Sequence, residues 1–118
     1  VVRDDCSRLL EESIRLAVPI WSTNKGIIPF ALYLCQSSGT TITIGDPGLL
    51  PRGIIGIHSW LRAQLQELGE NCRASVLVDL SEVRGQDLLH VFLKHQQTPS
   101  FQAYYPLPSS NHWWVKEE

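Results

Sequence analysis

The sequence predicts an α+β fold in which two helices pack on one face of an antiparallel or mixed sheet of four or five strands. Two stretches carry apolar residues at helical spacing, one near the N-terminus and one after residue 53. Two other regions consist of β-branched and aromatic runs separated by turn residues, which is typical of hairpins. We therefore expect a two-layer α/β sandwich, a single domain over residues 1–118 with the element order α-β-β-α-β-β-(β).

The first helix is predicted to begin near Asp4 or Asp5, because either carboxylate can accept hydrogen bonds from the free N–H groups of a first helical turn. Its apolar stripe includes Leu9 and Ile14, and its opposite side is charged. We expect the helix to end before Pro19, because the residue that precedes a proline is pushed out of the helical region. A helix with one apolar stripe is expected to pack against another element.

A first hairpin is expected from residues 27–35 and 40–44, with a short loop around Gly39. Pro29 must lie at the start of its strand or on a sheet edge, because proline donates no hydrogen bond to a strand ladder. The next stretch, residues 45–53, holds three glycines and two prolines in nine residues. Such a composition predicts a connector.

The second helix is the most strongly periodic segment and is predicted to run for about 17 residues from Ile54. Gly69 follows it, at the place where a C-terminal cap is expected. The predicted apolar face of this helix comprises Ile54, Ile57, His58, Leu61, Leu65 and Leu68.

A second hairpin is expected from residues 74–83 and 88–94, joined by a turn at residues 84–87. Residues 101–107 are a candidate fifth strand, and residues 108–118 form an aromatic C-terminal tail. This order of helices and hairpins resembles that of small roadblock-like and profilin-like domains. The resemblance is one of element order alone, and it implies no function.

The composition argues against several classes of function. Ten basic residues face twelve acidic ones, and no basic stripe is present, so we do not expect nucleic acid as a partner. No apolar run approaches the roughly 20 residues that span a bilayer, so no membrane partner is expected either. The apolar content of 43% is sufficient for a core, and the sequence suggests no cofactor.

The three cysteines, Cys6, Cys35 and Cys72, are an odd number and form no C-x-x-C pair. A secreted disulfide framework would favour an even set, so we expect reduced thiols in a cytoplasmic protein. One disulfide with a remaining free thiol is the alternative. A nucleophilic cysteine is less favoured, because none has a flanking catalytic signature.

The polar residues of the second hairpin are the first candidates for chemistry. Because side chains alternate along a strand, Asp79 and His90 share one sheet face if the two strands pair. A histidine beside a carboxylate is an ingredient of acid–base catalysis, but it is also ordinary surface pairing, which is the interpretation we favour. His90 and His95 are expected on opposite faces, so a joint metal site is not predicted. No catalytic residue is assigned.

The second face of the predicted sheet gives the main indication of function. We expect the helices to cover one uniformly apolar face, which leaves apolar side chains on the other face in need of cover. The favoured interpretation is a non-catalytic protein–protein interaction domain of a regulatory, adaptor or toxin-neutralising type. Its partner would be another protein or a second copy in a homodimer. The predicted interface residues are Leu77, Leu88, Phe92, Tyr104, Trp113 and Trp114.

The alternative is a small enzyme or a small-ligand-binding domain with a pocket between the sheet and the second helix. The predicted lining residues are His58, Trp60, Asp79 and His90. A cleft where these groups converge would favour this alternative, whereas a flat apolar face would favour the interaction domain.

Overall fold

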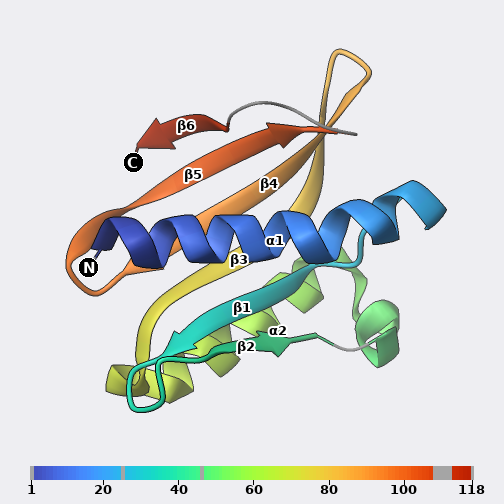
Figure 1. Ribbon diagram of the computed structural model, residues 1–118. Helices are drawn as coiled ribbons and strands as arrows, with labels where there is room; N and C mark the ends of the chain where they lie inside the picture. The colour runs from blue at the N-terminus through green and yellow to red at the C-terminus, as the bar shows by residue number, and fades with distance from the viewer. Residues whose placement is uncertain (1, 25, 46, 108–112, 118) are drawn as a thin grey trace.

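The computed structural model describes residues 2–24, 26–45, 47–107 and 113–117. It contains a six-stranded antiparallel sheet with the strand order β2-β1-β3-β4-β5-β6 (Figure 1). The α+β class is confirmed, but the sheet has six strands rather than four or five. The elements are α1 (Val2–Asn24), β1 (Phe30–Cys35), β2 (Thr41–Ile44), η1 (Pro47–Arg52), α2 (Gly53–Leu68), η2 (Gly69–Asn71), β3 (Cys72–Val83), β4 (Gln86–His95), β5 (Thr98–Pro106) and β6 (Trp114–Glu117).

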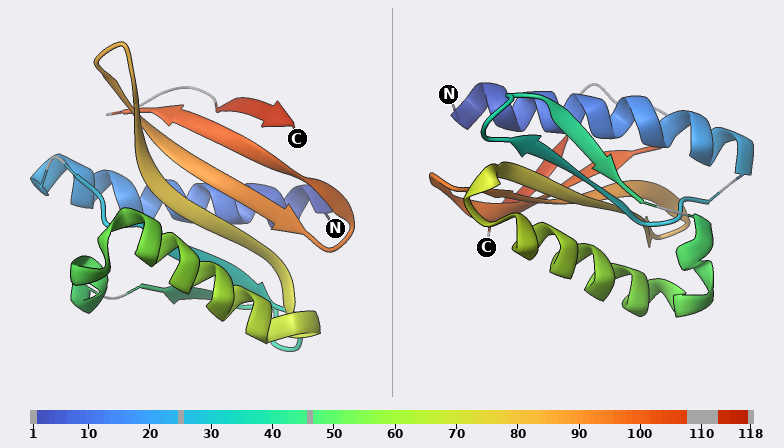
Figure 2. Two further views of the ribbon diagram at one scale, coloured as in Figure 1. Left: turned by 180° about the vertical axis from the view of Figure 1, so that it is seen from behind. Right: turned by 90° about the horizontal axis from the view of Figure 1, so that it is seen from below.

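The two helices lie on opposite faces of the sheet, so the predicted packing of both helices on one face is wrong. Figure 2 shows the sheet between α1 on one side and α2 on the other. α1 contacts β1, β3 and β4, whereas α2 contacts β1 and β3. The described part of the chain therefore forms three layers rather than two.

The central strand β3 explains this arrangement. Its segment Ala74–Val78 is buried at every position. Because successive side chains point to opposite faces, a continuous buried run requires cover on both sides of the sheet. Val76 accordingly packs beneath α1, while its neighbour Leu77 packs beneath α2.

Each face has its own apolar cluster of buried side chains. The α1-side cluster consists of Leu9, Ala17, Phe30, Leu32, Leu34, Ala74, Val76, Val78, Leu89, Val91, Leu93, Tyr105 and Leu107. The α2-side cluster consists of Ala31, Ile57, Leu61 and Leu77. Most of the described core therefore lies on the α1 side.

α1 extends beyond the predicted end at Pro19 and includes that proline. The extension is held by Trp21, which packs against the α1-side cluster and donates a hydrogen bond from Nε1 to Asp87 Oδ2 at 2.7 Å. At the other end, Asp5 is not a cap, because it lies within the first turns of the helix and is buried. None of the helices in the described part of the chain is long and apolar enough to cross a membrane.

The second hairpin is built on a tight turn at Arg84 and Gly85, whose φ angles are 53° and 79°. Positive φ at both central residues matches the right-handed twist of the two strands. The resulting register pairs Asp79 with His90 and Val78 with Val91. This pairing confirms the expectation that Asp79 and His90 share a sheet face.

The C-terminal tail supplies the strand that the sequence did not predict. β6 pairs antiparallel with β5, and just before it the ring of Trp113 lies 5.2 Å from that of Tyr105 on the α1 side. Trp114 and Val115 of β6 are 48% and 59% exposed. Residues 108–112 of the predicted tail lie outside the described residues.

α2 agrees closely with its prediction. It begins at Gly53 and ends at Leu68, and Gly69 follows with a φ of 54°, as expected for a C-terminal cap. Ile57 and Leu61 are its buried residues, whereas Ile54 is exposed. The connector before α2 includes the short 3-10 helix η1.

Candidate functional site

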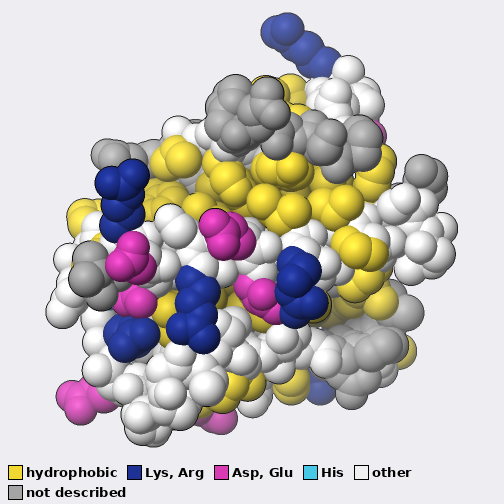
Figure 3. All heavy atoms as spheres, viewed as in Figure 1, with side chains coloured by type: hydrophobic (Ala, Val, Ile, Leu, Met, Phe, Trp, Pro, Cys, Tyr) yellow, Lys and Arg dark blue, Asp and Glu magenta, His cyan; other side chains and the backbone are white. Residues whose placement is uncertain are grey.

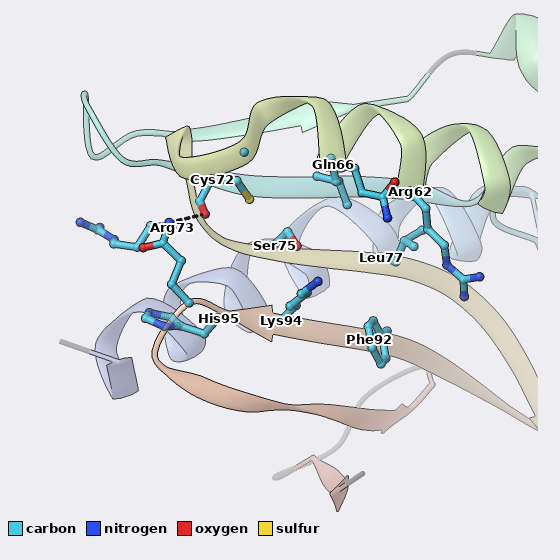
Figure 4. A pocket seen from close by; sticks show the side chains of 12 residues that line it. Arg62, Gln66, Cys72, Arg73, Ser75, Leu77, Phe92, Lys94 and His95 are labelled. Atoms are coloured by element: carbon cyan, nitrogen blue, oxygen red, sulfur yellow. Dashed lines mark hydrogen bonds between the residues drawn. The ribbon is translucent and has the colours of Figure 1, made fainter.

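The α2 side of the sheet is hollow next to the helix. A cavity of about 410 Å³, which we call the main cavity, is open to solvent and is lined by residues of α2, η2, β3 and β4. Figure 4 shows Arg62 projecting from α2, Leu77 and Ser75 from β3, and Phe92 and Lys94 from β4 around this space. With Arg73 of β3, the wall therefore combines apolar side chains with three long basic ones.

A second space of about 200 Å³, the small cavity, adjoins the main cavity. The two cavities share the lining residues Arg62, Leu77 and Phe92. The small cavity adds His58 and His90, which brings two of the predicted pocket residues to its wall. We call the two spaces together the α2 cleft.

A carboxylate joins the two histidines of the small cavity. Asp79 Oδ2 lies 2.9 Å from His58 Nε2, and Asp79 Oδ1 lies 2.8 Å from His90 Nδ1. All three side chains are about four-fifths buried, with exposed fractions of 19% for His58 and 20% for the other two. Asp79 of the central strand therefore links α2 to β4.

The hydrogen-bond network continues from His90 into β5. His90 Nε2 lies 2.7 Å from Gln102 Oε1, which also accepts a hydrogen bond from the Tyr104 hydroxyl at 3.2 Å. Both nitrogens of the His90 ring are engaged, Nδ1 with the Asp79 carboxylate and Nε2 with the Gln102 side chain. His90 is therefore poorly placed to accept a proton from a ligand.

Of the two imidazoles, His58 is the one with a ring nitrogen left available to a ligand. Its Nε2 faces Asp79, while no described residue forms a hydrogen bond with its Nδ1. The Nδ1 atom of His58 is therefore the nitrogen of this cluster that a ligand can reach. Among the described residues, no group of three or more His, Cys, Asp or Glu side chains is arranged so that it could hold a metal ion.

A second aspartate–histidine cluster lies at the far end of the main cavity. His95 Nε2 donates to Asp5 Oδ2 at 2.9 Å, and His95 Nδ1 accepts from the Gln97 backbone N–H at 3.0 Å. This pair of partners identifies a neutral His95 ring with its proton on Nε2. Arg73 Nε lies 3.2 Å from the same Asp5 oxygen.

The surroundings of Asp5 lower the pKa of its carboxyl group. Burial by itself raises this pKa, but the hydrogen bond from His95 and the positive charge of Arg73 together outweigh burial. Asp5 comes from α1 and His95 from the end of β4, so this cluster fastens the first helix to the sheet.

Two cysteines lie opposite each other at the edge of the main cavity. Cys35 at the end of β1 pairs in register with Cys72 at the start of β3, and Cys72 lines the cavity. Hydrogen bonds from the side chains of Ser37 and Ser38 lower the pKa of Cys35 to about 6. Burial raises the pKa of Cys72. Both thiols are free.

The structure distributes the predicted interface residues among different environments. Leu77 and Phe92 line the cleft, Leu88 is fully buried, and Tyr104 belongs to the hydrogen-bond network. Trp113 packs on the α1 side, whereas Trp114 is exposed. The predicted interface therefore does not form one continuous surface.

Among the predicted pocket residues, His58, Asp79 and His90 are brought together, whereas Trp60 packs against the α2-side cluster. Sequence reasoning missed Arg62 and Lys94. Both could have been found from spacing, because Arg62 lies one helical turn after His58 and Lys94 lies two residues after Phe92 on the same strand face.

Comparisons of this chain with protein-family models, with curated proteins and with solved structures found no match.

Proposed function

We propose that this domain binds a small organic molecule in the α2 cleft. The observation that supports the proposal is the pair of adjoining cavities, about 410 and 200 Å³, that share Arg62, Leu77 and Phe92. Small-molecule sites are concave, mostly apolar and supplied with a few polar groups, and their volumes are typically a few hundred cubic ångströms or more. The α2 cleft has each of these properties.

The polar groups around the cleft are held in place before any ligand arrives. Asp79 fixes the orientation of His58 and His90, and Gln102 engages the second nitrogen of His90. A site whose side chains are already ordered loses less conformational entropy when it binds. This preorganisation supports a binding role over an incidental gap in the packing.

The experiment uses the fluorescent probe N-phenyl-1-naphthylamine, which is neutral and apolar, with the full chain. Ser75→Phe places a ring in the main cavity and is expected to weaken probe binding about tenfold or more, because the ring occupies the space that the probe needs. Ser81→Phe is the matched control, since Ser81 lies on the same face of the same strand and beyond the lining of either cavity.

Circular dichroism of both variants would verify that the fold is retained. Equal probe binding by the wild type and both variants would contradict the proposal.

Protein–protein interaction is a second candidate function, and the outer strand β6 favours it. Figure 3 shows apolar side chains spread over the surface beside α1. Val115 of β6, which pairs with Ala103 of β5, is 59% exposed. A strand at a sheet edge presents unpaired backbone groups that can pair with another strand. A second copy of the chain is the matching occupant, because two identical edges can pair around a twofold axis.

Light scattering over a concentration series tests this second candidate. Val115→Lys in β6 is expected to abolish a dimer, while Ile42→Lys on the opposite edge strand β2 is expected to leave it intact. A wild type that stays monomeric at every concentration would remove the candidate. A dimer that is lost in Ile42→Lys alone would also contradict pairing through β6.

A further inference from the structure

We infer that the α2 cleft selects an amphiphilic organic anion, a molecule with an apolar body and one carboxylate, sulfonate or phosphate group. This inference rests on the proposed function and specifies the chemical class of its ligand.

The charge of the main cavity is the first observation. Arg62, Arg73 and Lys94 line the main cavity, and no Asp or Glu is among its lining residues. The chain as a whole carries a formal charge of −2, so the basic lining does not reflect the average surface. A concave site lined by one sign of charge concentrates ligands of the opposite sign.

Two of these cations are available to a ligand. Arg73 is paired with Asp5. In the part of the chain that the structure describes, no carboxylate lies within ion-pair distance of Arg62 or Lys94. They approach the cavity from different elements, α2 and β4, and so flank an incoming anionic group (Figure 4).

The apolar part of the lining is the second observation. Leu65 of α2, Leu77 of β3 and Phe92 of β4 line the main cavity, and the last two extend into the small cavity. A hydrocarbon or aromatic body that covers these side chains gains about 25 cal/mol for each Å² of apolar surface removed from water. A small hydrophilic anion would not cover this apolar surface. An apolar cation would cover it but would be repelled by the positive charges of Arg62 and Lys94.

Neutral polar groups complete the lining. Gln66 and Ser75 lie between the basic and apolar residues and offer an amide and a hydroxyl for hydrogen bonding. Each can donate to the oxygen of an anionic group, and such charge-assisted hydrogen bonds are stronger than neutral ones. Gln66 and Ser75 therefore add hydrogen-bond donors for an anion to the positive charges of Arg62 and Lys94.

A matched pair of probes tests the charge requirement. The fluorophore 8-anilino-1-naphthalenesulfonate has the same aromatic body as N-phenyl-1-naphthylamine and differs from it by one sulfonate group. We expect the sulfonate probe to bind the wild type more tightly than the neutral probe. Lys94→Gln and Arg62→Gln are each expected to weaken the sulfonate probe about five- to tenfold and to change the neutral probe less than about twofold.

Arg3→Gln is the matched control, because it removes an exposed positive charge from α1 on the other side of the sheet. It is expected to leave the binding of both probes unchanged. Sodium chloride should weaken the sulfonate probe in the wild type and have little effect on it in the Lys94→Gln, Arg62→Gln double variant.

Competition identifies which anionic group is preferred. Octanoate and octyl phosphate are compared as displacers of the sulfonate probe, with octanol as the uncharged control. Displacement by either anion at concentrations where octanol has no effect supports the inference, and the better displacer names the headgroup. Displacement by octanol as effective as that by both anions would overturn it.

The outcomes separate the two proposals. If neither probe binds, or if Ser75→Phe leaves both unaffected, the α2 cleft is not a ligand site and both proposals fail. If the neutral probe binds in the cleft but the sulfonate adds no affinity and the glutamine variants change nothing, the binding site stands and the inferred preference for an anion is wrong.

Discussion

The two faces of the sheet differ in how many apolar side chains they bury and in how closely those side chains pack. Among the described residues, the α1-side cluster contains thirteen buried side chains, whereas the α2-side cluster contains four. The α2 side holds instead two cavities and a hydrogen-bond network centred on Asp79. Because buried apolar area provides most of the free energy of folding, the α1 side stabilises the domain and leaves the α2 side able to remain polar and hollow.

The largest expected effect is a difference between two leucine truncations. Leu32→Ala on the α1 side should lower the free energy of unfolding by about 3 to 4 kcal/mol, because it empties a fully packed site. Leu77→Ala on the α2 side should lower it by about 1 to 2 kcal/mol, because this side chain already borders open space and has fewer neighbours to lose. Urea unfolding measures both values, and equal losses would contradict the comparison.

The two aspartate–histidine clusters provide the next comparison. Asp5→Asn should destabilise the protein by about 2 kcal/mol at pH 7, because Asp5 is only 7% exposed and accepts from His95 beside Arg73. Asp79→Asn should cost about 1 kcal/mol, because its cluster is more open to solvent.

The Asp5 effect has a defined pH dependence. The folded protein lowers the pKa of Asp5 below its ordinary value of 3.8, so the charged carboxylate adds stability above that value. This contribution is lost as the pH falls through the pKa of the folded state. The stability difference between the wild type and Asp5→Asn should therefore be full at pH 7 and shrink below about pH 4. A difference that grows in acid would show that Asp5 is not charged in the fold.

The two tail tryptophans should also differ. Trp113→Ala should lower the free energy of unfolding by about 1 to 2 kcal/mol, because the indole packs against Tyr105 on the α1 side. Trp114→Ala should change it by less than about 0.5 kcal/mol, because half of that side chain is exposed. Thermal unfolding of the two variants measures the difference, and a larger loss in Trp114→Ala would point to an association through β6.

The smallest effect on stability is expected at the cysteines, which should differ in the reactivity of their thiols instead. Cys35 should react with iodoacetamide at pH 7 about tenfold faster than Cys6 or Cys72, because its pKa of about 6 favours the thiolate while burial raises the pKa of each of the other two. Ser37→Ala should slow the reaction of Cys35 and move its pH midpoint upward. Mass spectrometry of the labelled peptides assigns each rate, and equal rates at the three thiols would refute this difference.

The α+β class and several individual elements could be predicted from local patterns. The alternation in β3 and β4 indicates which residues share a face, so Asp79 and His90 could be expected on the same side. The turn expected at residues 84–87 is shorter in the structure, where Arg84 and Gly85 are its central residues and β4 begins at Gln86. The helical spacing of α2 and the glycine after it placed that helix to within a residue or two. These features depend on residues that are close in the sequence.

The parts that could not be predicted depend on distant residues. Asp5 and His95 are 90 positions apart, and nothing in the spacing of either indicates the other. The side of the sheet on which each helix packs is likewise a matter of tertiary structure, although the consecutive apolar residues Val76, Leu77 and Val78 were a sign that both faces are covered. The cleft depends on the same information: spacing gives the face on which each residue lies, but Arg62 and Lys94 line one cavity only because α2 packs over this part of the sheet.

Because Asp79 lies between α2 and β4, its contacts bear on how easily α2 separates from the sheet. α2 rests on the sheet through two buried residues, Ile57 and Leu61, and through the link from His58 to Asp79. Local stability follows the amount of buried contact, so the backbone amides of α2 should exchange with deuterium before those of α1. The helix that forms one wall of the cleft is thus the one most easily displaced, and a molecule held beneath it would slow that exchange.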